Sequence, residues 1–261
     1  MLFSPVPLLC GLSVGLILGL TGGGGAILAV PLLVYILGFR VNQAVAISLG
    51  IVAISSLYGA IAQRRGGQVW WGTGIAIGCG GILGIPLGMW LANRVSERMT
   101  LLLFAGLMTF IGARMIFSRR GPRAPRWLRC PDSSTGGRIA VGCGLRLLGV
   151  GVVTGTLSRL FGVGGGFLIV PALIAVAGLG VAEAMATSLV AILIISTIGL
   201  VSHAQTILSI PLMVPSIFLV GSLIGVHVGV RFKSRIAPRL LQILFGVIVL
   251  IVAGVVIVAN I

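Results

Sequence analysis

Two glycine-rich blocks offer the clearest binding chemistry in this sequence. The first holds Gly22, Gly23, Gly24 and Gly25, and the second holds Gly164, Gly165 and Gly166. Glycine costs a helix about 1 kcal/mol relative to alanine, so each block predicts a break between an apolar helix and a short one. The short helix would begin with unpaired N–H groups and about half a positive charge, which suits a small oxyanion. The alternative is that the glycines only permit tight packing.

A few polar side chains near these blocks could complete an anion site. Ser48 and Ser188 lie at equivalent distances after the two blocks, and Thr187 precedes the second serine. Their hydroxyls could donate to bound oxygens, or instead to a carbonyl four residues earlier in the same helix. Arg159 lies just before the second block, and an ionisable residue at membrane depth is a functional hypothesis by default. It would neutralise the anion, unless its guanidinium reaches the outer interface.

The composition places these blocks in a membrane protein. The chain has 261 residues, of which 58% are hydrophobic and 8% charged, and its mean hydropathy is +1.23. Non-helical backbone inside a bilayer persists only where protein or a watery cavity covers it, and many transporters bind substrate at such helix breaks. The net charge of +15 comes from basic clusters between apolar runs, as membrane topology requires, so we expect no nucleic-acid partner. We also expect no removable signal peptide, because no charged n-region or cleavage site is present.

The apolar runs predict an all-α polytopic membrane protein. Helices are predicted at 5–21, 26–38, 43–62, 69–92 and 99–117, and again at 147–160, 167–178, 182–202, 211–230 and 240–259. Several helices carry glycines at four-residue spacing, as in Gly11, Gly15 and Gly19, which lets helix backbones approach closely. Asn42 is the predicted N-cap of the helix at 43–62.

The second set of helices repeats the first. Positions 11–59, aligned without gaps to 151–199, give 19 identities in 49, which indicates an internal repeat. We therefore divide the chain into a first transmembrane repeat at 1–117, a basic cytoplasmic linker at 118–146 and a second transmembrane repeat at 147–261. Each repeat is expected to hold a hairpin of two short helices, broken at the glycine-rich block, followed by three transmembrane helices.

The distribution of Lys and Arg favours opposite orientations for the two repeats. With the linker in the cytoplasm, inverted repeats place 14 of these residues inside and 3 outside, whereas parallel repeats place 10 inside and 7 outside. Because positive residues prefer the cytoplasmic side, we predict two inverted-topology repeats with both termini outside.

The sequence gives little support for catalysis or metal binding. Its three acids are Glu97, Asp132 and Glu183, and its four cysteines, at 10, 79, 130 and 143, lack zinc spacing. A membrane-embedded enzyme acting on sulfur groups would need a nucleophile with a partner base, and neither Cys79 nor Cys143 has a visible partner. We place Glu183 at a helix start, where its charge is favourable. We therefore predict no enzyme activity, cofactor or metal site.

The repeated blocks resemble the TauE/SafE sulfite-exporter family of bacterial membrane permeases. The resemblance rests on the run at 22–31, its counterpart at 162–171, and the Ala-x-Ser-Leu segments at 46–49 and 186–189. It covers nearly the whole chain. It implies a multi-pass protein of the bacterial inner membrane that transports sulfite, sulfoacetate or other organosulfonates.

We therefore predict an exporter of small sulfur-containing anions. An ungated pore would dissipate ions, so alternating access is the expected mechanism, with the anion held at the two glycine-rich breaks near the midplane. An importer of a sulfur compound on the same scaffold and an anion channel are the alternatives. The expected partners are a small anionic substrate and the lipid bilayer, and the sequence leaves a homo-oligomer open.

Overall fold

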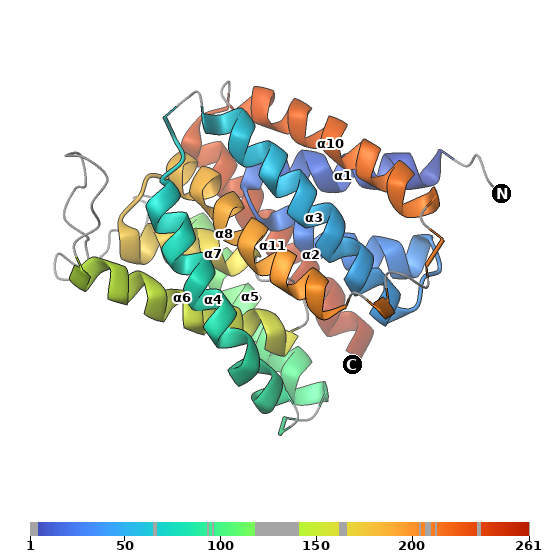
Figure 1. Cartoon of the computed structure of the whole chain (residues 1–261), viewed down its shortest axis with the longest axis horizontal. Helices are drawn as coiled ribbons and strands as arrows, with labels where there is room; N and C mark the ends of the chain where they lie inside the picture. Colours follow the sequence, from blue (N-terminus) through green and yellow to red (C-terminus); the bar gives the residue numbers. More distant parts are fainter. Residues whose placement is uncertain are drawn as a thin grey trace.

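Helices make up the regular structure of the described chain. The computed structural model describes residues 5–64, 67–92, 94–95, 97–117, 141–161, 166–203, 205–206, 210–211, 213–233 and 236–260. In the first half the elements are α1 (Val6–Thr21), α2 (Gly24–Pro31), η1 (Leu32–Ile36), α3 (Val41–Arg64), α4 (Trp71–Ala92) and α5 (Glu97–Phe117). In the second half they are α6 (Val141–Phe161), α7 (Gly166–Ala172), η2 (Leu173–Ala177), α8 (Val181–Ser202), α10 (Met213–Lys233) and α11 (Pro238–Asn260), as Figure 1 shows. The all-α prediction is confirmed.

The predicted helix starts lie within two residues of the observed ones, except that of α6. Helix α6 begins at Val141, six residues before the predicted start at residue 147. The N-cap prediction at Asn42 is wrong, because α3 begins at Val41 and Asn42 lies inside its first turn. The backbone N–H of Arg40 instead donates to the Gln43 side chain at 3.4 Å. A side chain three residues into the helix therefore reaches back, where we expected the residue before the helix to reach forward.

Helices α1 and α2 form a hairpin of two short helices. Helix α2 turns back along α1, because Gly25 lies against Val14 and Leu18, while Leu33, further along, shares a core cluster with Cys10. After the proline that closes α2, the chain passes into the π-helical turn η1, and α7 passes into η2 in the same way. Proline has no N–H for the bond to the carbonyl four residues earlier, so a local change of helical pitch there has a simple cause.

Glycines at four-residue spacing bring helices of opposite halves into backbone contact. Gly11 of α1 lies against Phe218 of α10, and Gly15 lies against Ser222, so closely that a Cβ at either glycine would overlap the α10 backbone. Residue numbers rise together in the two helices from one contact to the next, so α1 and α10 run parallel. Glycines of α4 and α6 join those two helices in the same manner. The predicted close approach of these helices is confirmed.

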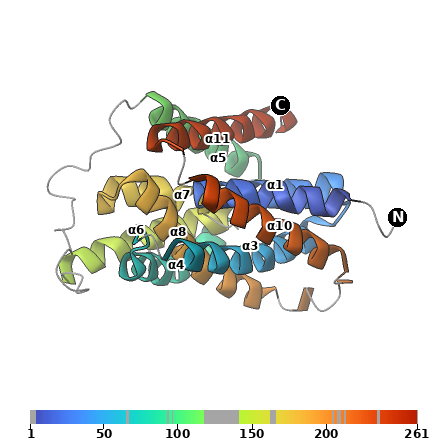
Figure 2. The same ribbon diagram turned by 90° about the horizontal axis from the view of Figure 1, so that it is seen from above.

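Equivalent helices of the two halves meet in opposite directions. Gly50 of α3 lies against Leu200 of α8, and Gly59 lies against Leu189. One series rises as the other falls, so α3 and α8 run antiparallel. Helices α5 and α11 also pack together antiparallel, and Figure 2 shows them side by side on one face of the bundle. The contacts also match between halves: α1 packs on α10 as α6 packs on α4, and α3 packs on α10 as α8 packs on α4.

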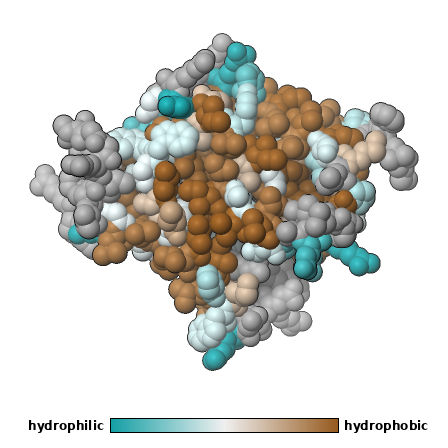
Figure 3. Space-filling view, viewed as in Figure 1, coloured by the Kyte–Doolittle hydropathy of each residue, from teal (hydrophilic) through white to brown (hydrophobic). Residues whose placement is uncertain are grey.

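Several helices have the length and apolar character of membrane spans. In the described part of the chain four helices qualify, at Val41–Arg64, Trp71–Leu91, Val181–Ser202 and Met213–Lys233. Shorter apolar helices lie at Val6–Thr21, Ile27–Ile36, Cys143–Ser158 and Arg239–Ile251. Figure 3 shows hydrophobic residues across the middle of the visible face, with hydrophilic residues toward its upper and lower edges. This pattern fits a protein embedded in a bilayer.

Candidate functional site

The first glycine block connects α1 to α2 at a sharp reversal. Gly22 has a φ of 72°, in the left-handed region that glycine adopts most readily, and its N–H donates to the Leu18 carbonyl at 2.8 Å. That bond closes the end of α1, and α2 begins two residues later at Gly24. All four glycines of the block are buried. The predicted helix break is therefore present, inside the protein.

Thr21 caps the start of α2, a role that we did not predict. Its Oγ1 accepts the Gly24 N–H at 2.9 Å and donates to the Ile17 carbonyl at 2.7 Å. One of the unpaired N–H groups at this helix start therefore already has a protein partner. The signal was available in the sequence, because a threonine lies directly before the glycine block.

Helix α8 contacts the first break directly. Ser188 is fully buried, and its Oγ has one hydrogen to donate, which the Gly22 carbonyl at 2.7 Å and the Met185 carbonyl of its own helix at 2.9 Å share. A Cβ at Gly22 would overlap the carbonyl of Met185. Ser188 therefore lies beside the first break, and its hydroxyl ties the second half of the chain to the first.

The start of α7, after the second glycine block, lies against the first break. Gly166 begins α7 and is buried, and a Cβ placed on it would lie 3.2 Å from the carbonyl oxygen of Gly23. Gly164 and Gly165 lie outside the described residues. Arg159 belongs to α6, but the position of its side chain is also outside the description. Of the predicted site residues, the structure therefore brings together the first block, Ser188 and the start of α7.

The other two predicted hydroxyls have protein partners. The Oγ of Ser48 donates to the Val45 carbonyl at 2.9 Å, within α3. The sequence left open an intrahelical bond to the carbonyl four residues earlier as the alternative to anion binding. The structure shows an intrahelical bond, to the carbonyl three residues earlier. The Oγ1 of Thr187 accepts the Trp70 N–H at 3.1 Å, which ties α8 to the start of α4. The hydrogen of the Thr187 hydroxyl takes no part in that bond.

Glycines of the first block lack a side chain for different reasons. Gly22 and Gly25 face the backbones of α8 and α1, so closely that a Cβ would overlap a carbonyl oxygen. Gly24 faces side chains instead, with Thr21 Oγ1 at 2.8 Å and Ile17 Cγ2 at 3.4 Å from a Cβ placed on it. Packing thus accounts for Gly22 and Gly25. Gly24 is the position where packing and anion contact can be separated by experiment.

Two further buried hydroxyls were missed in the sequence. Ser56 and Ser196 occupy equivalent positions in α3 and α8, both are fully buried, and neither Oγ has a hydrogen-bond partner in the described structure. Ile192, one turn before Ser196, lies against Gly166 at the second break. An unpartnered buried hydroxyl is costly, so Ser56 and Ser196 are added to the candidate polar residues of the two halves. Their identity in the repeat alignment was the available signal.

The described residues bring no catalytic or metal-binding group to the breaks. Within the described part of the chain, no cluster of three or more His, Cys, Asp and Glu side chains could hold a metal ion. The free thiols described are Cys10, buried in α1, and Cys79, exposed on α4. The chemistry gathered at the breaks is hydrogen bonding by backbone amides and hydroxyls.

Comparison with known proteins gives a consistent result. The family model described as "Sulfite exporter TauE/SafE" matches residues 7–256. A "Probable membrane transporter protein" of Xylella fastidiosa (strain Temecula1 / ATCC 700964) is 35% identical over 244 residues, covering 92% of this chain and 89% of the relative. Similarly named proteins are 27% identical in Bacillus subtilis (strain 168), over 94% of this chain and 96% of the relative, and 27% identical in Methanocaldococcus jannaschii, over 94% and 92%. No solved structure matches the chain.

Proposed function

The chain belongs to the TauE/SafE sulfite exporter family and is a membrane transporter, and we propose that it exports small sulfur-containing anions. The substrates in this proposal are sulfite, sulfoacetate or other organosulfonates, and the protein lies as a multi-pass permease in the bacterial inner membrane. The anion is held between the two glycine-rich helix breaks, and alternating access carries it across.

The observation that carries this proposal is the contact between the first break and the start of α7. Helix α2 begins at Gly24 and α7 begins at Gly166, and Gly166 lies against Gly23. The amide-rich, partly positive ends of two short helices therefore share one buried region. A small oxyanion has acceptor oxygens on several sides and little apolar surface, so it could accept N–H groups from both ends at once. Ser196 lies one turn beyond Ile192, the α8 residue that packs against Gly166, and its hydroxyl has no hydrogen-bond partner in the described structure.

The helix directions support the inverted repeat in this proposal. A two-fold axis along the membrane normal would leave equivalent helices parallel, whereas an axis in the membrane plane reverses them. The pairs α3 with α8 and α5 with α11 run antiparallel. In transporters with inverted repeats, binding sites lie at the repeat interface, and one repeat rocks against the other around the bound substrate. The Ser188–Gly22 bond crosses that interface.

The electrical driving force favours export of an anion. An inside-negative potential moves one negative charge outward with about 2.3 kcal/mol per 100 mV. An anion that enters from the cytoplasm therefore needs no coupled ion to leave the cell. We place the end of the bundle that holds Arg64 and Arg239 in the cytoplasm, because positive residues collect there.

Flux across liposomes that contain the purified full-length chain tests the proposal. Sulfite, sulfate, thiosulfate and short sulfonates are loaded inside or outside, and a potential of either sign is imposed with a potassium gradient. We expect saturable flux of a sulfur anion that reverses with the sign of the potential and stays absent in protein-free liposomes. Flux that needs a proton or sodium gradient directed inward would favour an importer. Single-channel currents without saturation would favour a channel, and absence of flux for every sulfur anion would end the substrate assignment.

A further inference from the structure

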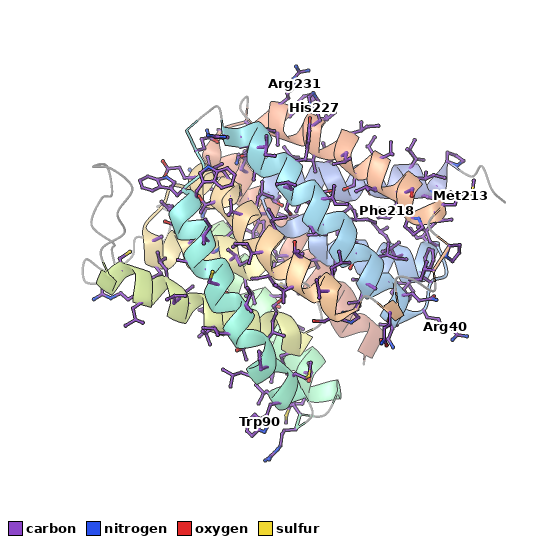
Figure 4. All side chains as sticks on the ribbon, viewed as in Figure 1. Arg40, Trp90, Met213, Phe218, His227 and Arg231 are labelled. Atoms are coloured by element: carbon purple, nitrogen blue, oxygen red, sulfur yellow. The ribbon has the colours of Figure 1, made fainter. Side chains whose placement is uncertain are left out.

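A buried lysine lies at one end of the bundle, away from the glycine breaks. Lys233 is the last residue of α10, at the end of that helix where Figure 4 labels Arg231, and it is 6% exposed. Its Nζ donates to the side-chain oxygen of Gln63, near the end of α3, and to the carbonyl of Ala182, at the start of α8, at 3.0 Å. Three helices from both halves therefore meet at this ammonium group.

The neutral groups around Lys233 do not offset its positive charge, and they leave N–H donors without acceptors. An ammonium group has three N–H donors, and these two bonds use two of them. Gln63 is only 6% exposed, and its buried Nε2 has no hydrogen-bond partner in the described structure. Helix α8 begins at Val181, so its partly positive end adds to the charge.

Lys233 makes no ion pair within the described residues. The acid nearest to it along α8 is Glu183, in the helix-start position that we predicted, and its Oε2 accepts the Gly180 N–H at 3.0 Å. The neighbouring cations Arg64 and Arg231 are exposed at the same end, where water and salt screen their charge. A buried cation with neutral acceptors alone is costly, whereas an anion on the remaining donors would offset that cost.

We propose that Lys233 and Gln63 bind a small oxyanion at this end of the helix bundle. The anion would accept the third ammonium N–H and the free amide N–H of Gln63, and the start of α8 would add a favourable field. Ser188 lies six residues further along α8, about 9 Å by helix rise, so this is a second site, separate from the helix breaks.

The Lys233 site has no counterpart at the equivalent positions of the other repeat. In the register that pairs Gly80 with Gly221, Lys233 pairs with Ala92, and Gln63 pairs with His203. The opposite end of the bundle therefore has no equivalent lysine. If the proposed function holds, this end faces the cytoplasm, and the site is where the exported anion first loses water.

Anion-dependent thermal unfolding of the full chain in lipid nanodiscs tests the site apart from transport. Sulfate and sulfite are titrated at constant ionic strength, and the midpoint shift gives an apparent affinity. We expect Lys233→Met to weaken that affinity about tenfold or more, as the loss of a charge-assisted hydrogen bond implies. Gln63→Glu should do the same in a folded protein, because its carboxylate would occupy the ammonium group. Arg64→Gln, which removes an exposed charge next to Gln63, is the matched control and should change the affinity less than about twofold.

The lipid composition identifies the source of the oxyanion. If a lipid phosphate fills the site, anionic phosphatidylglycerol will lower the apparent sulfate affinity of the native protein and leave Lys233→Met unchanged. If a soluble anion fills it, the lipid will have no such effect. Equal sulfate affinity in the native protein, Lys233→Met and Gln63→Glu would overturn the proposal. Liposome flux of the same proteins separates the failure of this site from the failure of the proposed function. If the native protein transports sulfur anions but all variants bind sulfate equally, only the Lys233 site is wrong. If sulfate binding depends on Lys233 but no sulfur anion is transported, only the transport assignment is wrong.

Discussion

Replacing Ser188 with alanine should loosen the contact between α8 and the first helix break. The fully buried Oγ of Ser188 donates to the Gly22 carbonyl at 2.7 Å, across the interface between the two halves. Leaving a buried acceptor without its donor costs about 1–3 kcal/mol in general, and hydrogen bonds between helices in membranes average about 0.6 kcal/mol. The substitution adds no bulk, so we expect the free energy of unfolding to fall by about 1 kcal/mol.

Ser48→Ala is the matched control for this change. Ser48 occupies the equivalent position in α3, but its hydroxyl donates to the Val45 carbonyl of its own helix. Such a bond joins no two elements, and serine bonds of this kind do not stabilise helices. We expect Ser48→Ala to leave the free energy of unfolding nearly unchanged.

Both variants are measured by reversible unfolding in bicelles and by initial rates of flux in liposomes. If the anion-bound conformation loses this 1 kcal/mol of stability relative to the anion-free one, the apparent affinity for the transported anion should weaken about fivefold in Ser188→Ala. Ser48→Ala should transport as the native protein does. Equal losses in both variants, or no loss in Ser188→Ala by either measurement, would refute the role assigned to the Ser188–Gly22 bond.

Variants at three other places test the helix break, a buried hydroxyl and the topology. Gly22→Ala should prevent correct folding, because its Cβ would overlap the α8 backbone and its φ is positive. Gly24→Ala should still fold, with a loss of about 1–2 kcal/mol, because its Cβ would displace the Thr21 hydroxyl that caps α2, and it should transport poorly. Normal flux in Gly24→Ala would show that the amides near it do not touch the anion. Ser196→Ala removes a buried hydroxyl without a partner, so it should raise the free energy of unfolding by about 1 kcal/mol, and we also expect it to slow flux. A lower stability of Ser196→Ala on calorimetry would contradict this. Cysteines placed at the exposed Arg40 and Arg239 should react with impermeant thiol reagents from the outside and the cytoplasmic side respectively, in a background without the native cysteines; labelling of both from one side would exclude inverted repeats.

Hydrophobic pattern and repetition were enough to predict the helices and the break between α1 and α2. The apolar runs have lengths set by the bilayer, and four glycines in a row can hardly continue a helix. Helix starts were harder, because they depend on which side chain reaches the first N–H groups. At α3 that side chain is Gln43 rather than Asn42, and both residue types suit a helix start.

The repeat could not reveal how equivalent residues would differ. Ser48 and Ser188 share the Ala-x-Ser-Leu motif, and each hydroxyl reaches a carbonyl three residues back, yet only that of Ser188 also reaches the first break. That difference depends on which helix packs opposite, and local sequence does not contain it. The burial of Lys233 was missed for the same reason, because a lysine at the end of an apolar helix usually lies at the interface, and only the meeting of three helices encloses it.

The most direct test is an anomalous diffraction map of the protein soaked with selenite, a heavier analogue of sulfite. Its selenium should give a peak between the starts of α2 and α7, within hydrogen-bond reach of the amides near Gly24 and Gly166. Excess sulfite should displace it. A protein that transports selenite but shows no selenium at the breaks under saturating conditions would contradict binding of the anion between the two helix ends.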